Sequence, residues 1–245
     1  MTGKKNSSTT GAWRLEPPED GIAVLVFDLP GEKVNKLSKA VLDDLDGVLD
    51  GIASDERIRA LVVTGGKEKS GTFIAGADIG EIRSIVNLAE ATELARRGQA
   101  VLSKLAGMRA VTIAAIHGNC LGGGAEFALA CDFRLGSDSE KTRLALPEVQ
   151  LGILPGFGGT QRLPRLVGLA RALPLVLGGK PLGMRKALKL GMVDEVVYVS
   201  DLREASVSFA ARVLAGKGKA YRPRSRLRKS SLLLRLVEKI RPGRN

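Results

Sequence analysis

Two glutamates in the middle of the 245-residue chain are placed where they could move protons. Glu126 follows the triple glycine Gly122–Gly124, and Glu148 comes twenty-two residues later. A second glycine-rich turn follows at 156–159. A pair of carboxyl groups can act as general base and general acid, because one takes a proton while the other gives one. The stretch 118–162 therefore predicts proton-transfer chemistry.

Two turns offer backbone N–H groups that could accompany these carboxyl groups. The apolar run 110–116 is typical of a buried strand, and the glycines after it begin a helix, which leaves the N–H of Gly123 without a helical partner. A second strand-to-helix turn at 75–78 leaves the N–H of Ala77 free in the same way. Two N–H groups that converge on one point form an oxyanion hole, which stabilises a carbonyl oxygen as it becomes negative.

Other kinds of site find less support in the sequence. His117 is the single histidine, and a lone histidine is more often structural than a base. Cys120 and Cys131 fit no zinc-ligand spacing, so we expect two buried, reduced thiols and no metal. Neither GxxxxGK(S/T) nor GxGxxG occurs, which excludes a dinucleotide site in this chain. Proton transfer next to a carbonyl, through an enolate, is favoured over covalent acyl transfer.

Each of these features also has a simpler explanation. Glycines at a strand–helix junction can serve the turn alone. Glu126 could be a helix-start residue that meets the helix dipole, and Glu148, after Pro147, could lie in a solvated loop. The residues alone leave both interpretations open, because they do not show that the two turns and the two glutamates meet.

The hydrophobic pattern predicts an α/β fold with crossover connections between strands. Ser38 is a candidate N-cap for a helix with apolar residues at Val41, Leu42, Leu45, Val48, Leu49 and Ile52, and Asp78 for the next helix. Further strands are expected at 21–30, 60–66, 71–75 and 195–200. Further helices are expected at 88–105, 160–167, 170–177, 185–190 and 202–214.

Most of the net charge of +12 lies at one end of the chain. Residues 216–245 hold eleven Lys and Arg and one acidic residue, which leaves a nearly neutral body with 27 basic and 25 acidic residues. The body has no interleaved aromatic and basic stripe, which argues against nucleic-acid binding. No apolar run is long enough for a membrane span, and the polar N-terminus lacks a signal core, so we expect a cytoplasmic protein.

Three segments are expected along the chain. Residues 1–11 are typical of a disordered leader, and residues 12–215 of one globular domain. Residues 216–245 predict a basic linker and an amphipathic helix capped by Ser230, whose leucines need a surface to cover them.

Four motifs in order resemble the crotonase, or enoyl-CoA hydratase/isomerase, superfamily. They are FIAGADI (73–79), AAIHGNCLGGGAEFALACD (114–132), LPEVQLGILPGFGGTQRLPRLVG (146–168) and KALKLGMVDEVV (186–197). The resemblance covers residues 13–215. It implies a crotonase fold of repeated ββα units with stacked sheets and a helical C-terminal region.

The resemblance also implies roles for individual residues in the hydration of trans-2-enoyl-CoA. Glu126 and Glu148 would be the catalytic pair, and Ala77 and Gly123 would donate the oxyanion-hole N–H groups. The substrate-binding residues would be Ala75, Gly76, Asp78, Gly122, Pro155 and Gly156. Isomerisation of 3-enoyl-CoA at the same site is a second implied activity. An isomerase or hydrolase without hydratase activity and an RNA-binding relative remain the alternatives.

Several segments narrow the resemblance to the hydratase half of the bacterial multifunctional fatty-acid oxidation alpha subunit. They include DLPGEKVNKLS (28–38) and the basic tail. This implies a role in β-oxidation, a 3-hydroxyacyl-CoA dehydrogenase half beyond this chain with NAD bound only there, a thiolase partner subunit and a homo-oligomer. Ala125 and Phe157 depart from the residues common in the family, and Phe157 leaves the acyl chain length open.

Overall fold

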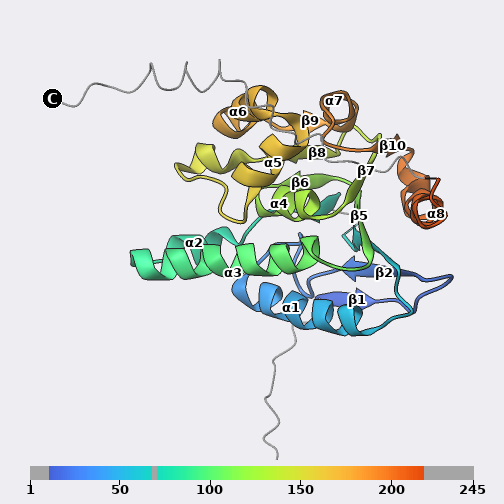
Figure 1. Ribbon diagram of the computed structural model, residues 1–245. Helices are drawn as coiled ribbons and strands as arrows, with labels where there is room; N and C mark the ends of the chain where they lie inside the picture. Colours follow the sequence, from blue (N-terminus) through green and yellow to red (C-terminus); the bar gives the residue numbers. More distant parts are fainter. Residues whose placement is uncertain (1–10, 68–70, 218–245) are drawn as a thin grey trace, which may run out of the picture.

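The computed structural model describes residues 11–67 and 71–217 (Figure 1). The predicted leader, apart from Gly11, and the predicted linker and helix beyond Lys217 lie outside these residues. Within the described ranges, no helix is long and apolar enough to cross a membrane.

A six-stranded sheet forms the centre of the molecule. Its order is β1 (Trp13–Leu15), β2 (Ile22–Phe27), β3 (Ala60–Gly65), β5 (Val111–Ile116), β7 (Phe133–Ser137) and β10 (Glu195–Val197). The strands from β2 to β10 are all parallel, and only β1 is antiparallel to its neighbour. The predicted α/β class with crossover connections is therefore confirmed.

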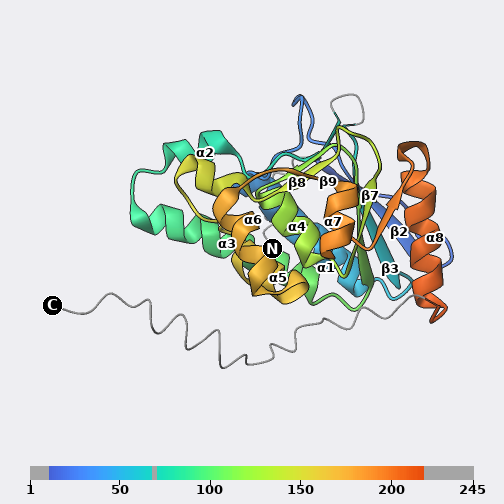
Figure 2. The ribbon, with the colours of Figure 1, turned by 90° about the horizontal axis from the view of Figure 1, so that it is seen from above.

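Both faces of this sheet are buried, which explains why its central strands read as continuous apolar runs. One face packs on α8 (Leu202–Leu214) and the other on a larger core that includes α1 (Lys39–Ser54), α3 (Leu88–Ala106) and α4 (Gly123–Ala130). Figure 2 shows α8 on one side of the strands and α4 on the other. The helix α4 has no exposed residue, so its first turn is dry.

A second, four-stranded sheet places the two predicted turns next to each other. Its order is β4 (Thr72–Ile74), β6 (Asn119–Leu121), β8 (Arg143–Ala145) and β9 (Leu182–Gly183). The strands β4 and β6 pair in parallel, so their carboxyl ends lie at the same edge. Beyond β4 the chain turns into α2 (Ile79–Ser84), with Asp78 as the N-cap, and beyond β6 into α4.

The C-terminal half of the domain is mainly helical. It contains η1 (Pro147–Leu151), α5 (Gly159–Val167), α6 (Leu169–Gly178), α7 (Met184–Leu190) and η2 (Val199–Asp201). All predicted helices within the described residues are present, with Ser38 capping α1 through the N–H of Val41. The last strand is shorter than predicted, because its pairing ends where Val197 meets Ser137 at the end of β7.

A buried asparagine ties the two sheets together near the first turn. The Asn35 side chain donates to the carbonyl oxygens of Phe27 (2.6 Å) and Phe73 (3.0 Å), at the end of β2 and within β4. Its Oδ1 accepts from the N–H of Leu29, and its backbone carbonyl accepts from the N–H of Ala75. Asn35 therefore holds the turn at 75–78 against the large sheet.

We predict that Asn35→Ala lowers the free energy of unfolding by about 1–3 kcal/mol, because the carbonyl groups of Phe27 and Phe73 and the N–H of Leu29 each lose a hydrogen bond to the Asn35 side chain. Urea unfolding followed by circular dichroism measures the change. Lys33→Ala, at an exposed position two residues away, is the control and should stay within about 0.5 kcal/mol of the wild type. Equal stability of the two variants would contradict the assigned role of Asn35.

Candidate active site

The candidate site is built around Gly122, where β6 ends and α4 begins. This glycine has φ 51° and ψ −124°, a backbone conformation that residues with a β-carbon rarely adopt. Its N–H donates to the carbonyl of Ala145, and its carbonyl accepts from the N–H of Glu126 (3.0 Å). The turn therefore points the first N–H groups of α4 back toward the end of β4.

The two predicted turns lie side by side. A β-carbon built on Gly123 would be only 3.2 Å from the Ala77 nitrogen, and one built on Gly76 would be 3.3 Å from the carbonyl oxygen of Leu121. Among the described residues, no acceptor takes the N–H of Ala77 or Gly123. The two N–H groups are therefore close together and available to a third group.

Glu126 lies on the first turn of α4 and is buried, with 1% of its surface exposed. Its Oε1 accepts from the N–H groups of Phe157 (2.8 Å) and Gly159 (2.7 Å). Burial raises the pKa of this carboxyl, while the two N–H groups act against the rise. These two hydrogen bonds fix the position of Oε1.

Glu148 is also buried, so the solvated-loop interpretation is wrong. It lies in η1 directly after Pro147, with 8% of its surface exposed. Its Oε1 would be 3.1 Å from a β-carbon on Gly122, and its Oε2 has no hydrogen-bond partner among the described residues. Burial, with a smaller contribution from the charge of Glu126, raises its pKa to about 7. Gly122 thus lies beside the Glu148 carboxyl group and accepts from the backbone N–H of Glu126, whose charge acts on Glu148.

The predicted substrate-binding residues fall into two groups. Ala75, Gly76, Asp78 and Gly122 belong to the two adjoining turns. The Asp78 carboxylate is occupied there, because it caps α2 through the N–H of Gly80 (2.8 Å) and pairs with Lys36 (3.1 Å). Partial burial acts to raise the pKa of Asp78, but the ion pair with Lys36 and the N–H of Gly80 hold this pKa below its ordinary value.

Pro155 and Gly156 lie on the loop between η1 and α5 that leads to the N–H groups around Glu126. The carbonyl of Gly156 accepts from the side chain of Gln99 on α3 (2.7 Å). The loop is also held at its other end, because Arg162 on α5 donates to the carbonyl of Phe157 (2.7 Å). Burial lowers the pKa of Arg162, and the charge of Glu126 acts against that.

Sequence reasoning missed the partners that hold Glu126 and the turn. These are Asn35, the N–H groups of Phe157 and Gly159, and Arg162. The one available signal was the glycine-rich stretch 156–159, whose backbone approaches Glu126 closely. A β-carbon on Gly159 would be 3.0 Å from the Oε1 of Glu126.

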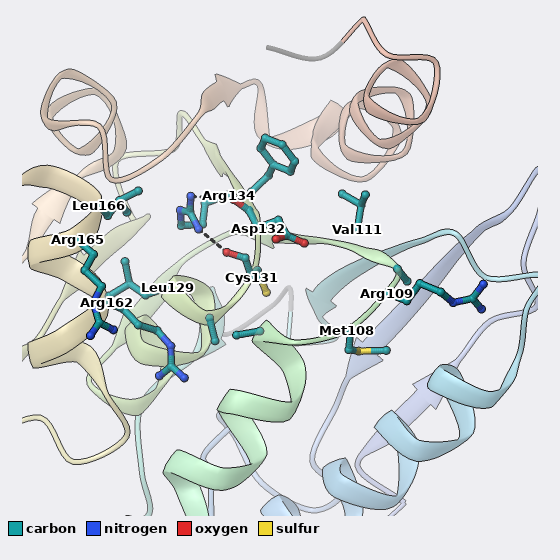
Figure 3. Close-up of a pocket in the computed structure, with 14 residues that line it drawn as sticks. Met108, Arg109, Val111, Leu129, Cys131, Asp132, Arg134, Arg162, Arg165 and Leu166 are labelled. Carbon is teal, nitrogen blue, oxygen red and sulfur yellow. Dashed lines mark hydrogen bonds between the residues drawn. The ribbon is translucent and has the colours of Figure 1, made fainter. Parts of the chain in front are cut away.

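A pocket of about 570 Å³ lies at the opposite end of α4, and neither glutamate lines it. Figure 3 shows Arg162 and Arg165 extending from α5 toward this pocket, with Arg134 beside Cys131. Arg134 donates to the carbonyl of Cys131 (2.6 Å), so it caps the end of α4. The pocket therefore belongs to the far end of the helix that carries Glu126.

The two thiols are not suited to act as nucleophiles, and that of Cys120 donates to the carbonyl of Gly124 in the first turn of α4. Cys120 and Cys131 are buried and free, as predicted, and burial raises the pKa of both, that of Cys131 to about 12. A thiol that stays protonated is a poor nucleophile. Within residues 11–67 and 71–217, no group of His, Cys, Asp and Glu could hold a metal ion.

Comparison with known proteins identifies the family. Residues 18–232 match the model of the enoyl-CoA hydratase/isomerase family. The chain belongs to this family. The predicted resemblance to the crotonase superfamily is therefore confirmed.

Individual relatives agree with this assignment. The fatty acid oxidation complex subunit alpha of Shewanella amazonensis is 46% identical over 94% of this chain, which covers 31% of that protein. An enoyl-CoA hydratase from Bacillus anthracis shares the fold with a TM-score of 0.77 and 32% identity, over 83% of this chain and 77% of that chain. DspI from Pseudomonas aeruginosa matches with a TM-score of 0.77 and 34% identity, over 86% of this chain and 78% of that chain.

The predicted crotonase fold is thus confirmed. The chain spans about a third of the length of the curated relatives it matches.

We predict that Glu148→Gln stabilises the protein at pH 8 but not at pH 4. The folded-state pKa of about 7 lies above the ordinary value of 4.5, so the folded wild type resists the ionisation of Glu148. The wild type therefore loses stability as the pH rises from about 4.5 to about 7. The stability difference between variant and wild type should be about 3 kcal/mol larger at pH 8 than at pH 4. Urea unfolding at both pH values measures it.

Glu93→Gln, at an exposed position of α3, is the matched control, because water hydrates its side chain in both forms. A Glu148→Gln difference that is the same at both pH values would contradict the raised pKa.

Proposed function

We propose that the chain is an enoyl-CoA hydratase, which adds water across the trans-2 double bond of an enoyl-CoA thioester. The observation that supports this most strongly is that the backbone N–H groups of Ala77 and Gly123 lie close together, next to the buried Glu148 and at the start of the helical turn that carries the buried Glu126. Family membership supplies the acyl-CoA class of substrate.

The N–H groups of Ala77 and Gly123 would receive the thioester carbonyl oxygen. As water adds to C3, the π electrons of the double bond move toward this oxygen, which becomes an enolate. Two fixed N–H donors in a dry site stabilise that negative charge more than they stabilise the neutral carbonyl. Because the donors are backbone groups held by β4, β6 and α4, they need no reorganisation during the reaction.

The two glutamates divide the proton transfers. Glu126, held by two N–H groups, takes the proton of the attacking water as the oxygen bonds to C3. Glu148, whose pKa of about 7 keeps a large protonated fraction at neutral pH, gives its proton to C2 as the enolate collapses. One proton then passes from Glu126 to Glu148 to restore the starting state. The two carboxyl groups interact, so their titration belongs to the pair.

The alternatives fit the site less well. A covalent acyl mechanism needs a reactive nucleophile, but both thiols are buried at the core and kept protonated. Nucleic-acid binding rests on the basic residues after 216, of which only Lys217 lies in the described part of the chain.

The wider setting follows from the longer relatives. We propose that this domain acts in fatty-acid β-oxidation in the cytoplasm, as a homo-oligomer, and that a dehydrogenase domain using NAD and a thiolase subunit work beside it. The name of the Shewanella relative supports this setting. This chain itself would need no cofactor, because water addition involves no change in the substrate's oxidation state.

We predict that the purified chain removes the ultraviolet absorbance of the conjugated thioester in crotonyl-CoA. Glu126→Gln and Glu148→Gln should each be slower by about 100-fold or more, because each loses a proton-transfer group. Glu93→Gln should keep wild-type activity. If both active-site variants hydrate crotonyl-CoA at the wild-type rate, the proposed function is wrong.

A second reaction at the same site is the isomerisation of 3-enoyl-CoA. The carboxyl group of Glu148, with its unpaired Oε2, could take a proton from C2 and return it to C4. We predict that Glu126→Gln keeps most isomerase activity while Glu148→Gln loses it. Chromatography of the products from 3-hexenoyl-CoA measures this. Equal loss in both variants would contradict a single-carboxylate isomerisation.

A further inference from the structure

We propose that the ring of Phe157 is a positioning wedge, which is held between two glycines of α3 and α4 and sets the place of the Glu126 carboxylate. The inference rests on the proposed function for its kinetic consequences, although its structural part can be tested without any activity. We assign Phe157 no proton transfer of its own, so its proposed effect on the reaction acts through Glu126.

On one side the ring of Phe157 packs against Gly98, a buried glycine in the middle of α3. A β-carbon built on Gly98 would be 2.7 Å from Cγ of Phe157 and closer still to two further ring carbons. Atoms this close overlap, so even a methyl group would displace the ring. A glycine inside a helix costs stability relative to alanine. At Gly98 the absence of a β-carbon leaves room for the Phe157 ring.

On the other side the ring packs against Gly123, the residue whose N–H belongs to the proposed oxyanion hole. A β-carbon on Gly123 would be 3.2 Å from two ring carbons of Phe157 and also 3.2 Å from the Ala77 nitrogen. The ring edge therefore borders the space between the two turns. Figure 1 shows α3 running beside α4. Added β-carbons on Gly98 of α3 and on Gly123 of α4 would both meet the ring, so the ring lies between the two helices at this point.

Backbone hydrogen bonds couple the position of Phe157 to that of the Glu126 carboxyl group. Its N–H donates to Oε1 of Glu126 (2.8 Å), and the N–H of Gly159 donates to the same atom (2.7 Å). Its carbonyl is held by Arg162 (2.7 Å). The segment is thus fixed by the ring, by the carbonyl and by the N–H groups. The ring packs against α3 at Gly98, next to the hydrogen bond from Gln99 of the same helix to the carbonyl of Gly156.

The first variant is Gly98→Ala, whose methyl group should push the ring and shift the loop at 157–159. A misplacement of about 1 Å can reduce a rate by about 100-fold, so we expect kcat for crotonyl-CoA hydration to fall by that order while KM stays within about twofold. Weaker N–H bonds to Glu126 should also move the acidic limb of the kcat/KM profile to higher pH.

The chain offers a matched control in Gly51→Ala. Gly51 also lies within a helix, α1, but its added β-carbon would meet nothing within 4 Å. This variant should keep wild-type kcat and pH profile and melt about 1–4 °C higher, because alanine favours the helix. Loss of activity in both variants would show a general effect of helix substitution and overturn the proposal.

A double-mutant cycle with Phe157→Leu separates the wedge from other effects of Gly98→Ala. Leucine lacks the ring, so the alanine methyl group has less to displace. We expect the double variant to be no slower than Phe157→Leu alone, which is a non-additive result. Independent, additive losses of kcat would overturn the proposal.

Hydrogen exchange tests the wedge even if the chain hydrates no enoyl-CoA. The N–H groups of Phe157 and Gly159 donate to Glu126, which should slow their exchange in the wild type. Gly98→Ala should raise their exchange rates at least tenfold, while Gly51→Ala should not. Unchanged exchange in Gly98→Ala would contradict the wedge itself. Faster exchange without any hydratase activity in the wild type would leave the wedge intact and contradict only the proposed function.

Discussion

The backbone of Gly122 is the constraint on which the site depends. Its positive φ ends β6 and starts α4 in one residue, which aims the first N–H groups of the helix at the turn after β4. Its carbonyl starts the helical turn that carries Glu126, and its α-carbon leaves room for Glu148. A side chain here would strain the backbone and meet the Glu148 carboxyl, so the proposed oxyanion hole and the proposed carboxyl pair would be disturbed together.

Hydrogen bonding gives the two buried glutamates different properties. Both lie in a dry environment that raises their pKa values, but only Glu126 has two N–H groups on one oxygen to act against the rise. Glu148 has an unpartnered buried oxygen instead. Such an arrangement costs stability in the free protein, which is typical of sites prepared for a reaction. The asymmetry between the pair is the physical basis for assigning one as base and the other as acid.

The local patterns of the sequence were sufficient for the long elements. The apolar spacing behind Ser38 and the cap at Asp78 predicted α1 and α2 correctly, because helix periodicity and capping are local. The strands β6, β7, β8 and β9 were not predicted, because segments of two to five residues carry little periodic signal. The meeting of the two turns depends on the parallel pairing of β4 with β6, which no local pattern specifies. The burial of Glu148 likewise comes from tertiary packing.

The central claim is that the N–H groups of Ala77 and Gly123 polarise a thioester carbonyl between the two glutamates. The most direct measurement is the infrared stretching frequency of crotonyl-CoA labelled with ¹³C at its carbonyl, bound to the Glu126→Gln/Glu148→Gln variant, which should bind without turnover. We predict a frequency below that of the same thioester in water, because two fixed donors in a dry site lengthen the carbonyl bond. A bound frequency equal to or above the value in water would contradict the oxyanion hole.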